Sequence, residues 1–350
     1  MVMPISHFTA QTRIRRTRTL PAEGEILVRR DQKVNAMDSV GSCFLPGRHE
    51  LIDLYQSLGL SRKTSLESIS DRKVGETLQK GDVLAKTGKV IKRIVRAPGD
   101  CYIESIKDGK VLLEILNPPF ELKAGYDGFI QEVKPNWAVV VETYGCLIQG
   151  VWGNGRIASG LLVNTAKSES EEFTRSCVDV TMRGALVAGG FCRNQDSLEA
   201  AVDFSLRGLI LSSISSTLIR YVQNLEIPVI LLEGFGAVSL NPLAFQLLNQ
   251  NDRHDACVNA CEWDIYTGKR PEVVIPLPGS GTDPRDGGHI RQGSKVRVRV
   301  PPHTGAVGVV VQIREGSTTI HSGLRGNCAD VKFDKLPTTS FPLTNLDILE

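Results

Sequence analysis

The sequence has no long apolar run. None of its segments approaches the roughly 20 consecutive apolar residues that a helix needs to cross a bilayer. Residues 1–12 also lack the apolar core of a signal peptide. We therefore expect a cytoplasmic protein without membrane contact.

The chain also lacks an excess of charge of either sign. Its 350 residues carry a formal net charge of +2, with 41% hydrophobic and 23% charged residues, which is ordinary for a folded globular protein. A chain without a large positive field has no dominant polyanionic partner, so any contact with nucleic acid must come from a local basic patch. The length allows about two to three domains.

Recognisable catalytic motifs are missing as well. The sequence contains no Walker phosphate-binding loop, no Gly-x-Ser-x-Gly nucleophile elbow and no His-Glu-x-x-His motif. The six histidines lie mostly in predicted loops or near the termini, outside any motif with a nucleophile. We therefore expect a non-catalytic protein without a cofactor, although distant residues can still converge into an active site in a folded chain.

Cysteine is present but is not arranged as a disulfide framework. The eight cysteines are scattered, mostly among apolar neighbours, as expected for reduced and buried thiols in a long cytosolic chain. The one cluster of metal-ligand types, His254-x-x-Cys257-x-x-x-Cys261, has no clear fourth ligand nearby. We therefore predict buried thiols and no metal site.

From Gly81 to Val141 the sequence consists of short apolar runs between turn residues. Runs of four to six aliphatic and aromatic residues, bounded by Gly, Pro and Asp, are typical of strands. Asp108-Gly109, between two such runs, has the composition of a type I′ hairpin turn. These features predict a compact β-barrel or sandwich.

An internal repeat lies in the same half of the chain. Gly24-Glu-Ile-Leu-Val resembles Gly75-Glu-Thr-Leu-Gln, and each is followed by a polar turn and another apolar run. The repeat predicts two halves of one β unit. Between them, the apolar spacing over residues 50–60 predicts a short amphipathic helix.

The first residues of the chain are basic. Four arginines, with few apolar anchors among them, predict a flexible arm or an edge strand, and these are Arg13, Arg15, Arg16 and Arg18. Such an arm could contact phosphate, or it could be a solvated surface, because four arginines make only a short patch.

The hairpins at residues 20–43 and 75–143 resemble a barrel-sandwich hybrid, the fold of biotinyl and lipoyl carrier domains and of insertions in large RNA polymerase subunits. Such carriers present a modified lysine at a hairpin tip, in a Met-Lys-Met or Asp-Lys-Ala type setting, and neither occurs here. Lys107 and Lys110 flank the Asp108-Gly109 turn instead, where lysines usually form solvated surface. The resemblance therefore implies the shape without the swinging-arm chemistry.

Strands and helices alternate over residues 180–278. Buried apolar runs are separated by helical patterns, which predicts a small α/β domain with a parallel sheet and right-handed crossovers. The region is similar to small ligand-sensing or swivelling domains of the DRTGG type. In that type, Gly-Gly ends the first strand and an Ile-Pro-Val strand follows the second helix.

Ligands of open parallel sheets bind beyond the carboxyl ends of the strands. Backbone amides before a capped helix, with a guanidinium beside them, could bind a small anion there. Glycines and caps at these places are also what an ordinary strand-to-helix turn needs. The candidate ligand-binding residues are Gly189, Gly190, Arg193 and Glu233.

The last part of the chain follows a linker predicted over residues 279–292, which is rich in Gly and Pro. Residues 293–300 alternate strictly, so their basic side chains are expected on the outer face of a strand whose valines face the core. With a Gly-x-x-Gly-Val-Val hairpin and two later strands, residues 293–350 resemble the SH3-like barrel that carries KOW motifs in ribosomal and transcription-elongation proteins. A merely solvated strand face is the alternative. The candidate partner-binding residues, for phosphate or an acidic protein surface, are Lys295, Arg297, Arg299 and Arg314.

The expected fold class is therefore α+β multidomain, with a β-rich barrel-sandwich-like domain, a small parallel α/β domain and a C-terminal SH3-like β-barrel. The expected function is a non-catalytic binding or scaffold protein of a larger cytoplasmic assembly, docking to protein or nucleic acid through the last barrel. The alternative is sensing of a small anionic ligand, or an enzymatic function, in the α/β domain. The expected boundaries are a flexible basic arm at 1–19, the barrel-sandwich-like domain at 20–179, the α/β domain at 180–278, the linker at 279–292 and the barrel at 293–350.

Overall fold

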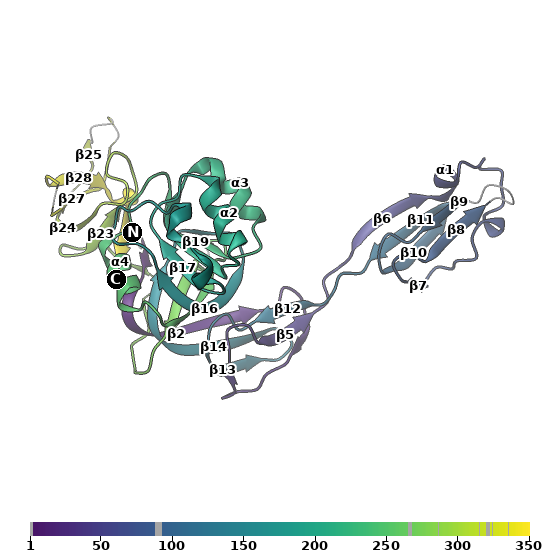
Figure 1. The fold of residues 1–350 in the computed structure, drawn as a ribbon, viewed down its shortest axis with the longest axis horizontal. Helices are drawn as coiled ribbons and strands as arrows, with labels where there is room; N and C mark the ends of the chain where they lie inside the picture. The colour runs from purple at the N-terminus through teal and green to yellow at the C-terminus, as the bar shows by residue number, and fades with distance from the viewer. Residues whose placement is uncertain are drawn as a thin grey trace.

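The computed structural model describes residues 3–87, 93–264, 268–285, 287–314, 316–319, 323, 325–334 and 336–350. It is rich in strands, which form several sheets, and its helices are short, consistent with an α+β protein of several parts. Figure 1 shows a main body that holds both chain ends and a β lobe that projects from it on two extended connections. The longest helices of the described residues have nine residues each, too few to span a membrane.

One sheet of 11 strands runs through the main body. Its order is β15-β19-β18-β17-β16-β20-β21-β14-β13-β4, and β2 pairs with β14 beside this path. β14 joins the parts of the sheet, because it pairs with β13, β2 and β21 along its length. The strands are β2 (Phe8–Thr19), β4 (Lys33–Val34), β13 (Gly128–Lys134), β14 (Ala138–Gln149), β15 (Trp152–Gly153), β16 (Ile157–Asn164), β17 (Leu186–Gly189), β18 (Gly208–Ile214), β19 (Val229–Phe235), β20 (Asp255–Asn259) and β21 (Glu272–Pro276).

The parallel pairing predicted for the middle of the chain is confirmed. β16, β17, β18 and β19 pair in parallel, each with the next. β20 pairs antiparallel with both β16 and β21. The parallel strands therefore continue into the antiparallel strands of the same sheet.

Two helices cover one face of the parallel strands. α2 (Gln195–Asp203) and α3 (Ile219–Asn224) pack there in a cluster that includes Val187, Leu209 and Val229, one residue from each of three strands. Because side chains alternate along a strand, the neighbouring residues of these strands face the other way.

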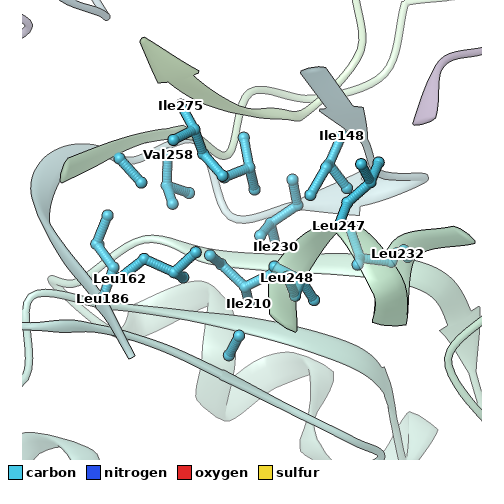
Figure 2. Packing of buried hydrophobic residues seen from close by; sticks show 14 of the residues in the cluster. Ile148, Leu162, Leu186, Ile210, Ile230, Leu232, Leu247, Leu248, Val258 and Ile275 are labelled. Atoms are coloured by element: carbon cyan, nitrogen blue, oxygen red, sulfur yellow. The ribbon is translucent and has the colours of Figure 1, made fainter. Parts of the chain in front are cut away.

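The opposite face is covered by α4 (Pro242–Gln250). Figure 2 shows Leu248 of this helix next to Ile210 and Ile230. The helix starts where the sequence favours it, since Asn241 caps it through its side chain and proline occupies the first turn. Burial on both faces explains why the parallel strands read as continuous apolar runs.

The repeat at Gly24 and Gly75 corresponds to two separate β lobes. The near lobe contains residues 20–47 and 117–134, and the far lobe, residues 48–116, is inserted into it. The far lobe has an apolar core of its own, whereas the core of the near lobe is shared with β2, β14 and β21. The prediction of two halves of one unit is therefore wrong, because the two copies bury their apolar side chains in two different cores.

The far lobe begins with a strand where a helix was predicted. β6 (Arg48–Asp53) pairs with β11 along its whole length, so helix α1 covers only Leu54–Leu58. Asp53 caps that helix and Gly59, at φ 66°, ends it. The other strands of the two lobes are β3 (Glu25–Ile26), β5 (Ser39–Cys43), β7 (Thr77–Leu78), β8 (Val83–Thr87), β9 (Arg93–Arg96), β10 (Cys101–Lys107), β11 (Lys110–Ile115) and β12 (Phe120–Lys123).

The predicted hairpin turn of the far lobe is confirmed. β10 and β11 pair up to Lys107 and Lys110, which leaves a two-residue loop. Asp108 has φ 51° and Gly109 has φ 74°, and a type I′ turn requires positive φ at both positions.

A second sheet, of seven strands, contains the end of the chain. Its order is β22-β1-β29-β23-β24-β27-β28, and among the described residues it does not close into the expected barrel. The free edge of β29 pairs instead with β1, in parallel. The strands are β1 (Met3–Ser6), β22 (Gly287–Gly288), β23 (Lys295–Val298), β24 (Val307–Ile313), β27 (Cys328–Lys332), β28 (Thr339–Pro342) and β29 (Leu346–Leu349), with β25 (Thr318–Thr319) and β26 (Arg325–Gly326) as a separate hairpin.

For the basic start of the chain, predicted as a flexible arm or an edge strand, the structure shows strands over most of residues 3–19. β1 belongs to the seven-stranded sheet, and β2 pairs with β14 from Phe8 to Thr19. Ile14 of β2 is fully buried, which anchors the basic segment to the core. The segment predicted as a linker packs against the same strand, since the backbone N–H of Arg13 donates to Thr282 O at 3.2 Å.

The substitution Gly109→Ala is expected to destabilise the far lobe. A Cβ at Gly109 would lie 2.0 Å from Cε2 of Tyr55, so alanine adds a clash to the strain of a left-handed backbone. We expect the free energy of opening of the β10–β11 hairpin, measured by native-state hydrogen exchange, to fall by about 2–4 kcal/mol.

The matched control is Gly155→Ala. Gly155 has φ 82°, but no atom lies within 4 Å of an added Cβ, so only the backbone strain of about 1–2 kcal/mol remains. If Gly109→Ala and Gly155→Ala lost the same amount of free energy, that result would contradict the close packing of Tyr55 on the turn.

Candidate functional site

Arg297 does not lie on an outer basic row. Its side chain is 4% exposed, whereas that of Arg299 is 41% exposed and Lys295 is also exposed. The predicted outer row is therefore wrong at its middle position. At Arg297 this face of β23 packs against the end of the parallel sheet, because Nη1 of Arg297 donates to Leu232 O on β19 at 3.0 Å.

Two carboxylates surround the buried guanidinium of Arg297. Nη1 donates to Glu233 Oε2 at 2.8 Å, and Nη2 donates to Asp347 Oδ2 at 3.1 Å. Burial alone would lower the pKa of Arg297, but the charges of Glu233 and Asp347 outweigh it and hold that pKa above its usual value. The cluster joins β23 and β29 of the second sheet to β19 of the first.

Glu233, a predicted ligand residue, is fully engaged in this cluster. One carboxylate oxygen accepts from Arg297, and the other accepts from the backbone N–H and the side-chain amide of Asn241, the cap of α4. Its side chain has no exposed surface. Glu233 is therefore a structural residue of the contact between the sheets.

Gly189 and Gly190, also predicted to bind a ligand, lie under a neighbouring segment. A Cβ on Gly189 would lie 2.6 Å from Phe173 Cδ2, and one on Gly190 would lie 1.7 Å from Glu171 O. The glycines thus allow residues 171–173 to cross the end of β17 closely, a common reason for glycine at a strand end.

Arg193 lies on the surface beside this segment. Its Nη1 is 3.7 Å from Glu172 Oε2, and its guanidinium carbon is 4.8 Å from the ring centroid of Phe191. Each predicted ligand residue of the parallel sheet therefore has a structural partner within the protein, and none needs an anion to satisfy it.

Arg299 and Arg314, predicted to bind a partner, are exposed but paired. Arg299 Nη1 donates to Asp347 Oδ1 at 3.3 Å, and Arg314 Nε lies 3.0 Å from Asp330 Oδ1. A hydrogen bond from Ser340 and the charge of Arg314 hold the pKa of Asp330 below its usual value. Of the four predicted residues, Lys295 alone is exposed without an ion pair among the described residues.

An exposed apolar row lies next to Lys295. Val309, Val311 and Ile313 of β24 are 41%, 36% and 37% exposed. The register of β24 with β27 shifts between Val310 and Gln312, and Gln312 is exposed as well. Val309 lies between Lys295 on β23 and Lys332 on β27, both exposed. We call the three apolar residues and the two lysines the β24 face.

The sequence does not reveal the β24 face, because residues 309–311 are all valine and the run reads as a buried strand. The alternation becomes visible only with the burial of each position, since Val310 is 1% exposed. The strict alternation of charge on β23 is the one available signal, because its partner strand must place alternate residues beside those charges.

The buried cysteines agree with the predicted thiols. Cys257 and Cys261 are 3% and 8% exposed, and burial raises their pKa values to about 12 and about 11. Among the described residues no group of three or more histidine, cysteine, aspartate or glutamate side chains is placed to hold a metal.

Comparison of the chain with protein-family models gives no match, and comparison with curated proteins gives none either.

Replacing Arg297 is expected to destabilise the contact between the two sheets. Arg297→Ala leaves Glu233 as a buried carboxylate without its counterion and removes one of the two arginine partners of Asp347, which costs about 3–5 kcal/mol. Urea unfolding, followed by fluorescence and by hydrogen exchange of β23 and β29, measures this loss.

The control is Arg314→Ala, which removes the partly exposed pair with Asp330. That loss should stay below about 1 kcal/mol, because water and salt screen the pair. If both variants lost the same small amount of unfolding free energy, the buried cluster around Arg297 would contribute little to stability.

Proposed function

We propose that the chain is a non-catalytic docking protein of a larger assembly and that it binds a protein partner through the β24 face. The carrying observation is that three apolar side chains of β24, those of Val309, Val311 and Ile313, are exposed, whereas Gly308 and Val310 of the same strand are buried. Aliphatic side chains gathered on a flat strand surface and bordered by charge are typical of docking surfaces.

The order of the strands supports an SH3-like module. β23, β24, β27 and β28 follow one another as antiparallel neighbours, and β29 returns to pair with β23. A short 3-10 helix, Leu343–Asn345, precedes β29. In this proposal β1 takes the edge at which the module joins the main body.

The charges beside the row favour a protein over nucleic acid. Phosphate backbones are bound by several unpaired cations, but Arg297 is buried and Arg299 and Arg314 are paired with carboxylates. Lys295 and Lys332 remain, one on each side of Val309. The matching partner surface has apolar side chains at its centre and carboxylates at its rim.

The shape of the chain supports a role in an assembly. The far lobe projects from the main body (Figure 1) and its connections carry apolar side chains in water, among them Phe44, which is 75% exposed. All eight cysteines are free thiols, and seven of them are buried, which supports the proposed cytoplasmic location. The alternative anion site at the ends of the parallel strands is less favoured, because Glu233 and Arg193 already have partners.

The test begins with chemical cross-linking of the full chain in its own cell, which identifies the partner protein. The partner is then purified, and its binding to the full chain is measured by calorimetry. Val311→Asp places a carboxylate among the apolar side chains. It should raise the dissociation constant at least tenfold, which corresponds to a loss of about 1.4 kcal/mol in binding free energy. Lys295→Glu and Lys332→Glu should slow association, with an effect that fades at high salt.

The matched control is Val180→Asp, since Val180 is 70% exposed and lies outside the second sheet. It should leave the dissociation constant unchanged. Equal binding by wild type and Val311→Asp would refute the β24 face. Binding of RNA or DNA with a steep salt slope, reduced by Lys295→Ala but not by Val311→Asp, would replace the protein partner with nucleic acid.

A further inference from the structure

A polar pocket with a volume of about 480 Å³ lies between β2 and the residues that lead into β21. It is separate from the β24 face and from the ends of the parallel strands. Five cationic side chains and one carboxylate line it, and we call it the arginine pocket: Arg15, Arg16, Arg18, Lys269, Arg270 and Glu272.

The one carboxylate of the arginine pocket is already used. Glu272 is 2% exposed and its Oε2 lies 2.8 Å from Nη2 of Arg16. Arg15 pairs at 3.4 Å with Glu142, outside the pocket. The remaining cations therefore receive no charge compensation from Glu272.

Arg18 is buried without a carboxylate partner. It is 8% exposed; its Nε donates to Ala124 O at 2.8 Å and its Nη2 makes no hydrogen bond. Its guanidinium carbon lies 5.7 Å from the ring centroid of Tyr126. Among the described residues no carboxylate lies within 4 Å of this guanidinium.

Arg270 repeats this arrangement on the other side of the pocket. It is 5% exposed; its Nη1 donates to Ser6 Oγ at 2.7 Å and its Nη2 makes no hydrogen bond. Its guanidinium carbon lies 4.5 Å from the ring centroid of Trp263, and in the described part of the chain it has no ion pair. Burial lowers the pKa of Arg270 to about 10, although Asp347 opposes this effect.

Two buried and uncompensated guanidiniums beside one pocket are a physical anomaly. A buried charge is costly unless an opposite charge or several hydrogen bonds satisfy it. A backbone carbonyl or a hydroxyl, together with an aromatic ring, supplies only part of what a carboxylate would. An anion in the pocket would complete both environments.

We propose that the arginine pocket binds a small phosphate ester, with its phosphate near Arg18 and Arg270. A phosphate dianion suits several guanidiniums better than a single carboxylate does, because its oxygens accept from more than one donor fork. The pocket is larger than a bare phosphate needs, and Gln149 and Asn259 offer amides to a polar organic part. Lys269, exposed at the rim, attracts the anion from solution.

The experiment uses the full chain in chloride buffer, with ionic strength held constant by sodium chloride. Inorganic phosphate, glycerol 3-phosphate and AMP are the probes, and binding is followed by calorimetry and by the midpoint of thermal unfolding. We expect at least one ester to bind more tightly than inorganic phosphate and to raise the unfolding midpoint. The preferred ester then separates a simple organic phosphate from a nucleotide.

Lys269→Glu reverses a charge at the rim of the arginine pocket without touching the core. It should therefore raise the dissociation constant of the preferred ester at least tenfold. Lys110→Glu is its control, because Lys110 is also exposed but lies in the far lobe, and it should bind like wild type. The proposal would be overturned if these two variants bound the esters equally well. It would also be overturned if no probe bound at 10 mM, a concentration about tenfold above the dissociation constant of a weak millimolar site.

Arg270→Met tests the buried charge itself. Methionine fills much of the same space without a charge to satisfy, so the ligand-free protein should unfold at the same or a higher temperature while its response to the esters disappears. A lower midpoint with the response retained would assign Arg270 a purely structural role and overturn the proposal. Binding of a single-stranded oligonucleotide, with no binding of the esters, would also overturn it.

Discussion

The contact between the two sheets of the main body depends on one buried arginine. Arg297 of β23 lies between Glu233, 64 positions earlier, and Asp347, 50 positions later. A buried ion cluster is tolerated only when its members satisfy one another, and here the carboxylates of Glu233 and Asp347 receive donors on both oxygens. On β24, Val307 packs against the core of the main body, whereas Val309, Val311 and Ile313 reach solvent.

This internal pairing changes where the chain can interact with other molecules. Arg297 and Glu233 appear in the sequence as candidates for two different sites, yet they pair with each other in the interior, so neither charge is free to bind a ligand or partner. Unpaired positive charge instead collects around β2, where Arg18 and Arg270 are buried beside the arginine pocket. The β24 face presents exposed apolar side chains, with one lysine on each side of Val309. The two surfaces thus differ in chemistry, which is why we propose a phosphate for one and a protein for the other.

The two β lobes show how a repeat can be used twice without forming one unit. The far lobe interrupts the near lobe between Cys43 and Phe120, which pair across the junction. The far lobe packs around a core of its own, whereas the near lobe shares its core with strands of the main body, and two connections join the far lobe to the near one (Figure 1). A lobe held in this way adds surface at a distance from the main body (Figure 1).

Local interactions made part of this structure predictable from the sequence alone. The Asp108-Gly109 turn, the alternation of strands and helices through β17, β18 and β19, and the buried thiols depend on neighbours a few positions away or on a regular pattern of apolar residues. The separation of the lobes, the close crossing over Gly190 and the burial of Arg297 depend on partners far away in the chain. Alternation on β23 states which side chains share a face, but only the tertiary structure decides whether solvent or another sheet covers that face.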